Sequence, residues 1–227
     1  MRTGPGVQDE CNWHGVAICR YRNGRRITAG LQLRKWIKDV RYDEKWEATL
    51  ISYLRCLYAA SNNAVGGVPE EICMLMDLES LLLENNQLGG SLPTCLTSLS
   101  SVFEFDVHSN DFSGSPPPGF FDMPKLQTLD LSSNQFSGGL NFLEGMNSRS
   151  TNSAQSTSPI TTLRLNNNGF VGDVPRSVYD LNALKILTLY GTSVTGNVSA
   201  LCSKPSVSVL STDCSQVACD EACCQCV

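Results

Sequence analysis

The stretch from Leu78 to Ser101 reads LESLLLENNQLGGSLPTCLTSLSS, and its pattern decides the fold. Neither the helix period of 3.6 residues nor the strand period of two fits its apolar residues throughout. A repeat fits better, because the same skeleton returns when the frame is shifted by 24 residues. The skeleton of this unit is Leu78, Leu81, Leu83, Asn86, Leu88, Gly90, Leu92, Leu96 and Leu99.

Six copies of the unit stand in register along the chain. Each L-x-x-L-x-L segment predicts a short strand whose leucines point into a shared core, while the residues between them point outward. A single turn cannot bury its leucines alone, so the sequence predicts a solenoid whose stability is a sum over neighbouring turns. The copies begin at Leu54, Leu78, Val102, Leu126, Ile160 and Leu184.

An asparagine follows the strand in five of the copies, and Thr192 replaces it in the last. We expect these asparagines to form one ladder that bonds to turn backbone which otherwise has no partner. Gly and then Pro turn the chain away from the sheet and fix its return path. The ladder residues are Asn62, Asn86, Asn110, Asn134 and Asn168.

The motif L-x-x-L-x-L-x-x-N-x-L-x-G-x-(I/V/L)-P, from Leu54 to Leu210, resembles the plant-type leucine-rich repeat. That repeat is known from receptor-like kinase and receptor-like protein ectodomains and from polygalacturonase-inhibiting proteins. The resemblance implies an α/β solenoid, a right-handed superhelix with a parallel sheet on its concave face. It also implies loops and short 3-10 or α turns on the convex face, and Cys-rich caps at both ends.

The expected organisation is one solenoid domain. A flexible tail over residues 1–10 precedes an N-terminal cap and irregular first turn over 11–53. The six repeats occupy 54–206, with a Ser/Thr-rich insertion at 147–159, and the last strand and Cys-rich cap occupy 207–227. We expect the insertion to be a mobile, protease-sensitive loop.

The irregular first turn has two expected parts. Ile27 to Leu33 is predicted to form the first strand. Residues 34–53 keep a loose helical spacing of apolar residues, which indicates a capping helix or an irregular turn. The tryptophans in that stretch, Trp36 and Trp46, either cover core or mark a partner site.

Composition limits the possible functions. The net charge of −5 argues against nucleic-acid binding, and no apolar run is long enough to span a membrane. Eleven cysteines, clustered at the two ends, indicate an oxidising compartment. The first ten residues lack the apolar stretch of a signal peptide, so we expect an export signal to be missing from this sequence. An extracellular or cell-surface protein is favoured, and a reduced cytosolic repeat protein is the alternative.

Cysteines at the N-terminus resemble a known cap. Cys11 to Cys19, CNWHGVAIC, is similar to the C-x-W-x-G-V-x-C cap before plant-type repeats, with one more residue between the cysteines. The resemblance implies a Cys11–Cys19 disulfide, with Trp13 covering the open end of the first turn.

The C-terminal cysteines should staple the other open end of the solenoid. The tail resembles the Cys-rich ends of diatom leucine-rich repeat proteins. Cys202 is predicted to point into the core and to bond to a tail cysteine, and the adjacent Cys223 and Cys224 should have different partners. Zinc binding is the alternative interpretation of so many cysteines within 13 residues. The tail cysteines are Cys214, Cys219, Cys223, Cys224 and Cys226.

No catalytic motif and no cofactor-binding motif is present, so we expect a protein that is not an enzyme and needs no cofactor. Only His14 and His108 are histidines, and an open sheet does not exclude water from a base at His108. Asn197-Val198-Ser199 is an N-glycosylation sequon.

Outward-facing strand positions form the predicted binding surface. Two columns of such residues cross consecutive strands, acidic at the centre and basic and polar toward the C-terminal side. Aromatic and charged side chains on rigid strands are typical of recognition surfaces. The predicted ligand-binding residues are Tyr58, Leu82, Glu84, Glu104, Asp106, His108, Asp130, Arg164, Asn166 and Tyr190.

The favoured function is recognition of a protein, peptide or glycan ligand by a receptor-like module. A ligand with basic groups would relieve the repulsion among the carboxylates at the centre of the surface. The family resemblance implies a signalling or defence context. The alternative is a secreted inhibitor of a cell-wall-degrading glycosidase. Adhesion or ice binding ranks last, because ice binding favours a regular Thr row and the outward columns are irregular.

Overall fold

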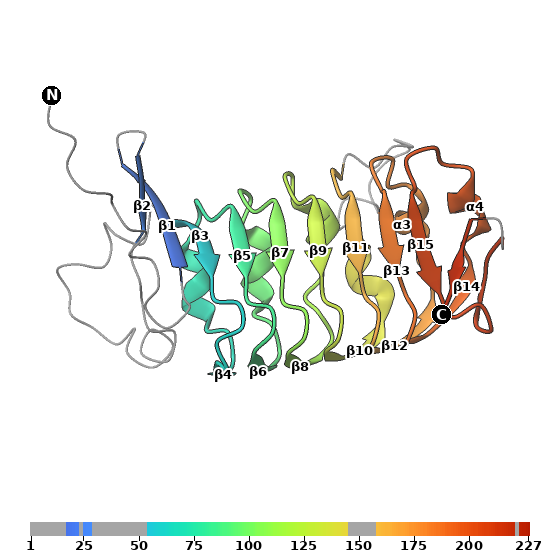
Figure 1. Cartoon of the computed structure of the whole chain (residues 1–227), viewed down its shortest axis with the longest axis horizontal. Coiled ribbons are helices and arrows are strands. Elements are labelled where there is room, and N and C mark those ends of the chain that lie inside the picture. The colour runs from blue at the N-terminus through green and yellow to red at the C-terminus, as the bar shows by residue number, and fades with distance from the viewer. Residues whose placement is uncertain (1–16, 23–24, 29–53, 145–157, 221–222) are drawn as a thin grey trace, which may run out of the picture.

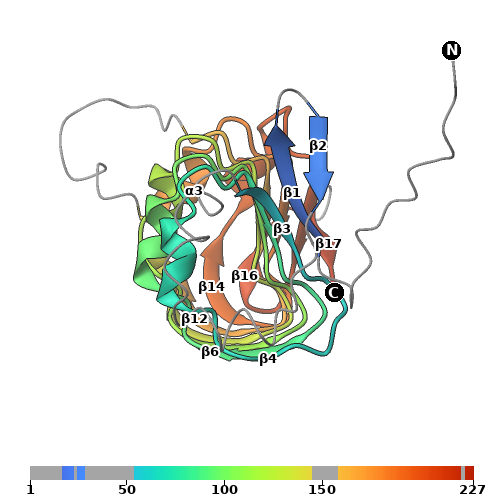
Figure 2. The ribbon, with the colours of Figure 1, turned by 90° about the vertical axis from the view of Figure 1, so that its left-hand side faces the viewer.

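The computed structural model describes residues 17–22, 25–28, 54–144, 158–220 and 223–227. Within these ranges the chain winds into a solenoid, and successive turns stack along its long axis (Figure 1). Viewed along that axis, each turn has three walls (Figure 2). A main sheet forms one wall, a second sheet forms the base, and short helices line the side opposite the main sheet.

The main sheet has ten strands among the described residues. From β3 onward each strand pairs in parallel with its neighbour one turn later, as the leucine repeat predicts. In sheet order the strands are β2 (Arg25–Thr28), β1 (Ala17–Arg22), β3 (Leu54–Tyr58), β5 (Ser80–Leu82), β7 (Glu104–Asp106), β9 (Thr128–Asp130), β11 (Thr162–Arg164), β13 (Ile186–Thr188), β15 (Val209–Thr212) and β17 (Gln225–Cys226).

The N-terminal edge differs from the prediction. Ile27 and Thr28, the described part of the predicted first strand over Ile27 to Leu33, lie in β2, and the rest of that prediction lies outside the described residues. β2 is not the first strand, because β1 precedes it and pairs with it antiparallel. β1 in turn pairs antiparallel with β3, so the parallel ladder begins at β3. The predictions for residues 1–10 and 34–53, and for the insertion at 147–159 apart from its last two residues, lie outside the described residues.

The second sheet was not predicted. It has seven short parallel strands among the described residues. Six of them each contribute one apolar side chain to the core, such as Leu88, Phe112 and Phe136, whereas Val65 in the first strand is exposed. These strands are β4 (Val65–Gly66), β6 (Gln87–Gly90), β8 (Asp111–Gly114), β10 (Gln135–Gly139), β12 (Gly169–Asp173), β14 (Ser193–Asn197) and β16 (Val217–Ala218).

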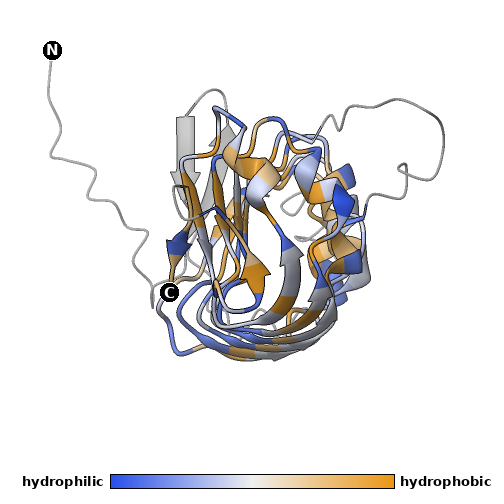
Figure 3. Cartoon of the chain, turned by 90° about the vertical axis from the view of Figure 1, so that its right-hand side faces the viewer, coloured by the Kyte–Doolittle hydropathy of each residue, from blue (hydrophilic) through white to orange (hydrophobic). Residues whose placement is uncertain are grey.

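The helical wall is built of single turns, each contributing apolar residues such as Ile72, Leu96 and Val178 to the core. Hydrophobic residues recur in all three walls around the interior (Figure 3). The helices are η1 (Glu70–Met74), η2 (Thr94–Ser98), η3 (Phe120–Asp122), η4 (Leu140–Leu143), α3 (Arg176–Tyr179) and α4 (Ser199–Cys202).

Aromatic rings extend the stacking of turns into the core. Phe112, Phe136 and Phe170 lie one above the other with ring centroids 6.1 and 6.2 Å apart and nearly parallel planes. All three are fully buried. The ring stack links three consecutive turns, which is the neighbour coupling expected of a solenoid.

The asparagine ladder is confirmed. The Asn110 Oδ1 accepts a hydrogen bond from the Leu88 N–H of the preceding turn at 2.9 Å. Its Nδ2 donates to the carbonyl oxygens of Leu83 at 2.9 Å and Val107 at 3.1 Å. Asn86, Asn134 and Asn168 bond in the same way, so these four rungs satisfy backbone groups of two turns and lock their spacing. At the last rung, Thr192 donates only to Leu189 O, within its own turn.

Candidate functional site

The outward positions of the main sheet form two columns, which we name the main-sheet face. Because the strands pair in register, residues between the buried leucines lie side by side. Glu104 stands at the start of β7, beside these columns. The first column runs Tyr58, Leu82, Asp106, Asp130, Arg164 and Thr188, and the second runs Ala60, Glu84, His108, Ser132, Asn166 and Tyr190.

Burial divides the ten predicted ligand residues. Eight are partly exposed, but Asp130 is 4% exposed and Asn166 is 6% exposed. The Asn166 Oδ1 accepts a hydrogen bond from the Thr188 hydroxyl at 2.6 Å. These buried polar groups hold the surface in place, so they are less available for the direct ligand contacts that the sequence predicted for them.

Asp106 and His108 form a hydrogen-bonded pair on the face. The Asp106 Oδ1 lies 2.7 Å from the His108 Nδ1 and also accepts the His108 backbone N–H at 2.9 Å. Burial raises the pKa of Asp106, and its backbone bond to His108 opposes that shift. The charge of Asp130 on the next strand raises the pKa of Asp106 further.

Asp130 is held more tightly. Its Oδ1 accepts the backbone N–H of Ser132 at 3.0 Å and the Ser132 hydroxyl at 2.6 Å. Its Oδ2 accepts from the Arg164 Nη1 at 3.2 Å. A buried carboxylate with these partners is part of the framework of the sheet, so we expect its removal to destabilise the fold.

The acidic centre therefore offers fewer available carboxylates than the sequence predicted. Of its four carboxylates, Asp106 and Asp130 are paired with His108 and Arg164, which leaves Glu84 and Glu104 as the half-exposed acids. The Glu84 Oε2 atom is buried and has no hydrogen-bond partner within the described residues. A buried carboxylate oxygen without a partner costs free energy, so part of the Glu84 side chain lies beneath the surface that a ligand can reach.

Asp106, His108 and Asp130 also place ligand-type atoms within 4.8 Å of one another. A cation there would compete with the Arg164 guanidinium, which already lies against Asp130. The cluster therefore fits an ion-pair network better than a metal centre.

The C-terminal cysteines pair as the sequence predicted in outline. Cys202 is bonded to Cys223, and the adjacent Cys224 is bonded to Cys219. Cys214–Cys226 is the third disulfide of the tail. The predicted core position of Cys202 is wrong by one residue, because Leu201 is fully buried and Cys202 only partly.

A further disulfide was not predicted. Cys73 on η1 is bonded to Cys95 on η2 and so ties two neighbouring turns together along the helical wall. The sequence contained a signal for this disulfide. Ile72 and Leu96 hold the same position in neighbouring repeats, Cys73 directly follows the first and Cys95 directly precedes the second.

The predicted Cys11–Cys19 disulfide lies outside the described side chains. Asn197, the sequon residue, is exposed. Its Oδ1 accepts the Ser199 N–H at 2.9 Å, and its backbone oxygen accepts the Tyr179 hydroxyl at 2.7 Å.

Comparison with known proteins agrees with this geometry. Residues 60–136 match the family model described as "Leucine rich repeat". The same turns continue on both sides of that segment, so the repeat region is a leucine-rich repeat solenoid of the type found in plant receptor ectodomains. A comparison with curated protein sequences finds no match.

Three solved structures illustrate the likeness. The ectodomain of the Arabidopsis thaliana receptor kinase SOBIR1 is 26% identical, with a TM-score of 0.55, over 81% of this chain and 83% of that one. The Arabidopsis receptor kinase HAESA, solved with the peptide hormone IDA and the co-receptor SERK1, is 25% identical with a TM-score of 0.55, over 65% of this chain and 24% of that one. PEPR1–AtPEP1 is 30% identical with a TM-score of 0.56, over 65% and 19%.

The chain thus spans about a quarter or less of the length of HAESA and PEPR1. The similarity is to non-catalytic ectodomains. Within the described residues, no helix has the length and apolar character needed to cross a membrane.

Proposed function

We propose that this chain is an extracellular recognition module that binds a peptide ligand along the main-sheet face, in a receptor-like signalling or defence context. The observation that carries the proposal is the composition of that face. Half-exposed Tyr58, Leu82 and Tyr190 offer amphipathic contacts on rigid strands, and Glu84 and Glu104 offer negative charge between them.

Side-chain pairing on the face supports a role in ligand orientation. The hydrogen-bonded Asp106–His108 pair and the Asp130–Arg164 ion pair fix four side chains across three strands, so the polar surface is organised before a ligand arrives. Preorganisation of this kind reduces the entropy cost of binding. The negative charge of the partly exposed Glu84 and Glu104 favours a ligand that carries a Lys or Arg side chain.

Comparison supports the ligand class, because HAESA was solved with a peptide hormone and is similar to this chain in fold. The disulfides at the C-terminus and on the helical wall favour an oxidising, extracellular setting. Asn197 is exposed and is our proposed glycosylation site.

The test is a peptide array probed with the full chain, in which neutral, acidic and Lys/Arg-containing peptides of equal length are represented. We expect enrichment of basic peptides, with binding that weakens as salt rises. Glu84→Ala with Glu104→Ala should abolish the enrichment. The matched control is Glu70→Ala with Glu71→Ala, which removes two exposed carboxylates from the first turn of η1 on the helical wall. Equal enrichment in both double variants would place the ligand elsewhere.

A further inference from the structure

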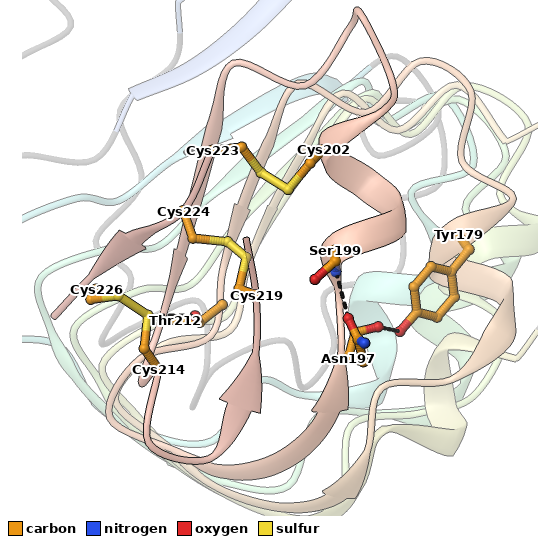
Figure 4. The surroundings of a disulfide bond; sticks show 10 residues. All are labelled: Tyr179, Asn197, Ser199, Cys202, Thr212, Cys214, Cys219, Cys223, Cys224 and Cys226. Atoms are coloured by element: carbon orange, nitrogen blue, oxygen red, sulfur yellow. Dashed lines mark hydrogen bonds between the residues drawn. A yellow bond between two sulfur atoms is a disulfide. The ribbon is translucent and has the colours of Figure 1, made fainter. Parts of the chain in front are cut away.

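Four cysteines at the C-terminal end form one compact sulfur cluster. The Sγ atoms of Cys202, Cys219, Cys223 and Cys224 all lie within 4.8 Å of one another. In Figure 4 the two disulfides of this cluster lie side by side, with Cys214–Cys226 set apart from them. All four side chains are partly buried against the core.

The chain reaches this arrangement from three separate segments. Cys202 ends α4, and Cys219 directly follows β16. Cys223 and Cys224 lie in a turn in which both backbone N–H groups donate to the Asp220 carbonyl oxygen, at 2.9 and 3.0 Å. In a strand, adjacent side chains would point to opposite sides, but this turn brings both thiol positions to the same cluster.

The geometry suits a metal as well as two disulfides. Zn²⁺ in structural sites binds four thiolates tetrahedrally at about 2.3 Å, which separates the sulfur atoms by about 3.8 Å. Four Sγ atoms within 4.8 Å need only small side-chain adjustments to reach that arrangement. We propose that the reduced form of the chain binds one Zn²⁺ ion at Cys202, Cys219, Cys223 and Cys224.

The two states are linked by a balanced exchange. Four molecules of a small thiol reduce the two protein disulfides and become two molecules of the small disulfide, which leaves four protein thiols. These thiols bind Zn²⁺ as thiolates and release four protons. In the reverse direction, two molecules of a small disulfide accept the four electrons and become four thiols, and Zn²⁺ is released as the protein disulfides form.

The consequence is a C-terminal cap that closes in either redox state. In both states α4, β16 and the tail are joined through the same four sulfurs, so the last turn of the solenoid stays covered. The chain would then hold its cap before its cysteines are oxidised, and zinc would be displaced on oxidation.

The experiment uses the full chain, reduced with a phosphine under anaerobic conditions and titrated with Zn²⁺ or Co²⁺. We expect one metal ion per chain and, with Co²⁺, the intense visible bands of a tetrahedral tetrathiolate complex. Oxidation with glutathione disulfide should release the metal. Absence of the Co²⁺–thiolate bands in the reduced wild-type chain would overturn the proposal without any variant.

Two double variants locate the site. Cys219→Ser with Cys224→Ser should lose the bound metal, whereas Cys214→Ser with Cys226→Ser removes two thiols from the same tail but lies outside the cluster and should retain one ion per chain. Circular dichroism of each reduced variant checks that the solenoid is folded. Retention of the tetrathiolate bands in the first variant, or their loss from a folded second variant, would contradict the assignment.

Discussion

Replacing Asn110 with alanine removes one rung of the asparagine ladder without touching a leucine. The side chain is 9% exposed. Its Oδ1 accepts one hydrogen bond, and the two N–H groups of Nδ2 are shared among three carbonyl oxygens, so the side chain bonds to backbone of its own turn and of the turn before. A net hydrogen bond contributes about 1 kcal/mol, and a buried donor left without a partner costs about 1–3 kcal/mol. We therefore expect a loss of about 2–4 kcal/mol in the free energy of unfolding.

The assay is urea unfolding followed by circular dichroism, with hydrogen exchange to locate the change. For a chain of this length the loss corresponds to a fall in Tm of about 4–16 °C. Exchange should accelerate first at Leu88, whose N–H loses its acceptor. Asn182→Ala, at an exposed position, is the control and should shift stability by less than about 0.5 kcal/mol. An Asn110→Ala variant as stable as this control would refute the claim that the ladder holds the turns together.

Three further predictions follow from the same structure. Thr192→Asn should stabilise the chain by about 1 kcal/mol in chemical denaturation, because an asparagine at this position can bond to the preceding turn as the other rungs do. A less stable variant would contradict the expected extra hydrogen bonds. Burial raises the pKa of Asp106 above 3.8, so the contribution of Asp106 to stability is present below pH 3.8 and is lost as the pH rises through its folded-state pKa. Asp106→Asn should therefore change the slope of the unfolding free energy against pH just above pH 3.8. An unchanged slope would contradict a raised pKa for Asp106. Cys73→Ser with Cys95→Ser should lower stability by about 3 kcal/mol in oxidising buffer only, given the 22-residue separation, and an equal loss under reducing conditions would point to packing instead.

The repeat region could be predicted because its signal is periodic. Leucine, asparagine and glycine recur at fixed offsets, so each copy reinforces the others, and the register of the main-sheet face followed directly. The second sheet was missed because its strands contain runs such as Ser137-Gly138-Gly139, with no alternating apolar pattern. Those strands pair because the turns stack, which is a consequence of the tertiary structure rather than of local propensity.

The chemistry of the face was harder to predict than its position. Outward register identified Asp130 and Asn166, but only the structure shows that Arg164, Ser132 and Thr188 cover and bond them. Register fixes the side of a sheet on which a side chain lies, whereas burial depends on the length and direction of its neighbours.

The predicted Cys11–Cys19 disulfide of the N-terminal cap is tested by peptide mapping without reductant. We expect the two cysteines in one linked peptide pair, and either cysteine found free or linked elsewhere would contradict the prediction.

Hydroxyl-radical footprinting with a peptide selected on the array tests the proposed binding surface most directly. Tyr58, His108 and Tyr190 report on the main-sheet face, and Met74 and Met76, which are 62% and 52% exposed, report on the side of η1. We predict that the peptide protects the first three side chains from oxidation and leaves both methionines unchanged. Protection of Met74 and Met76 with unchanged labelling of Tyr58, His108 and Tyr190 would contradict the proposal that ligands bind the main-sheet face.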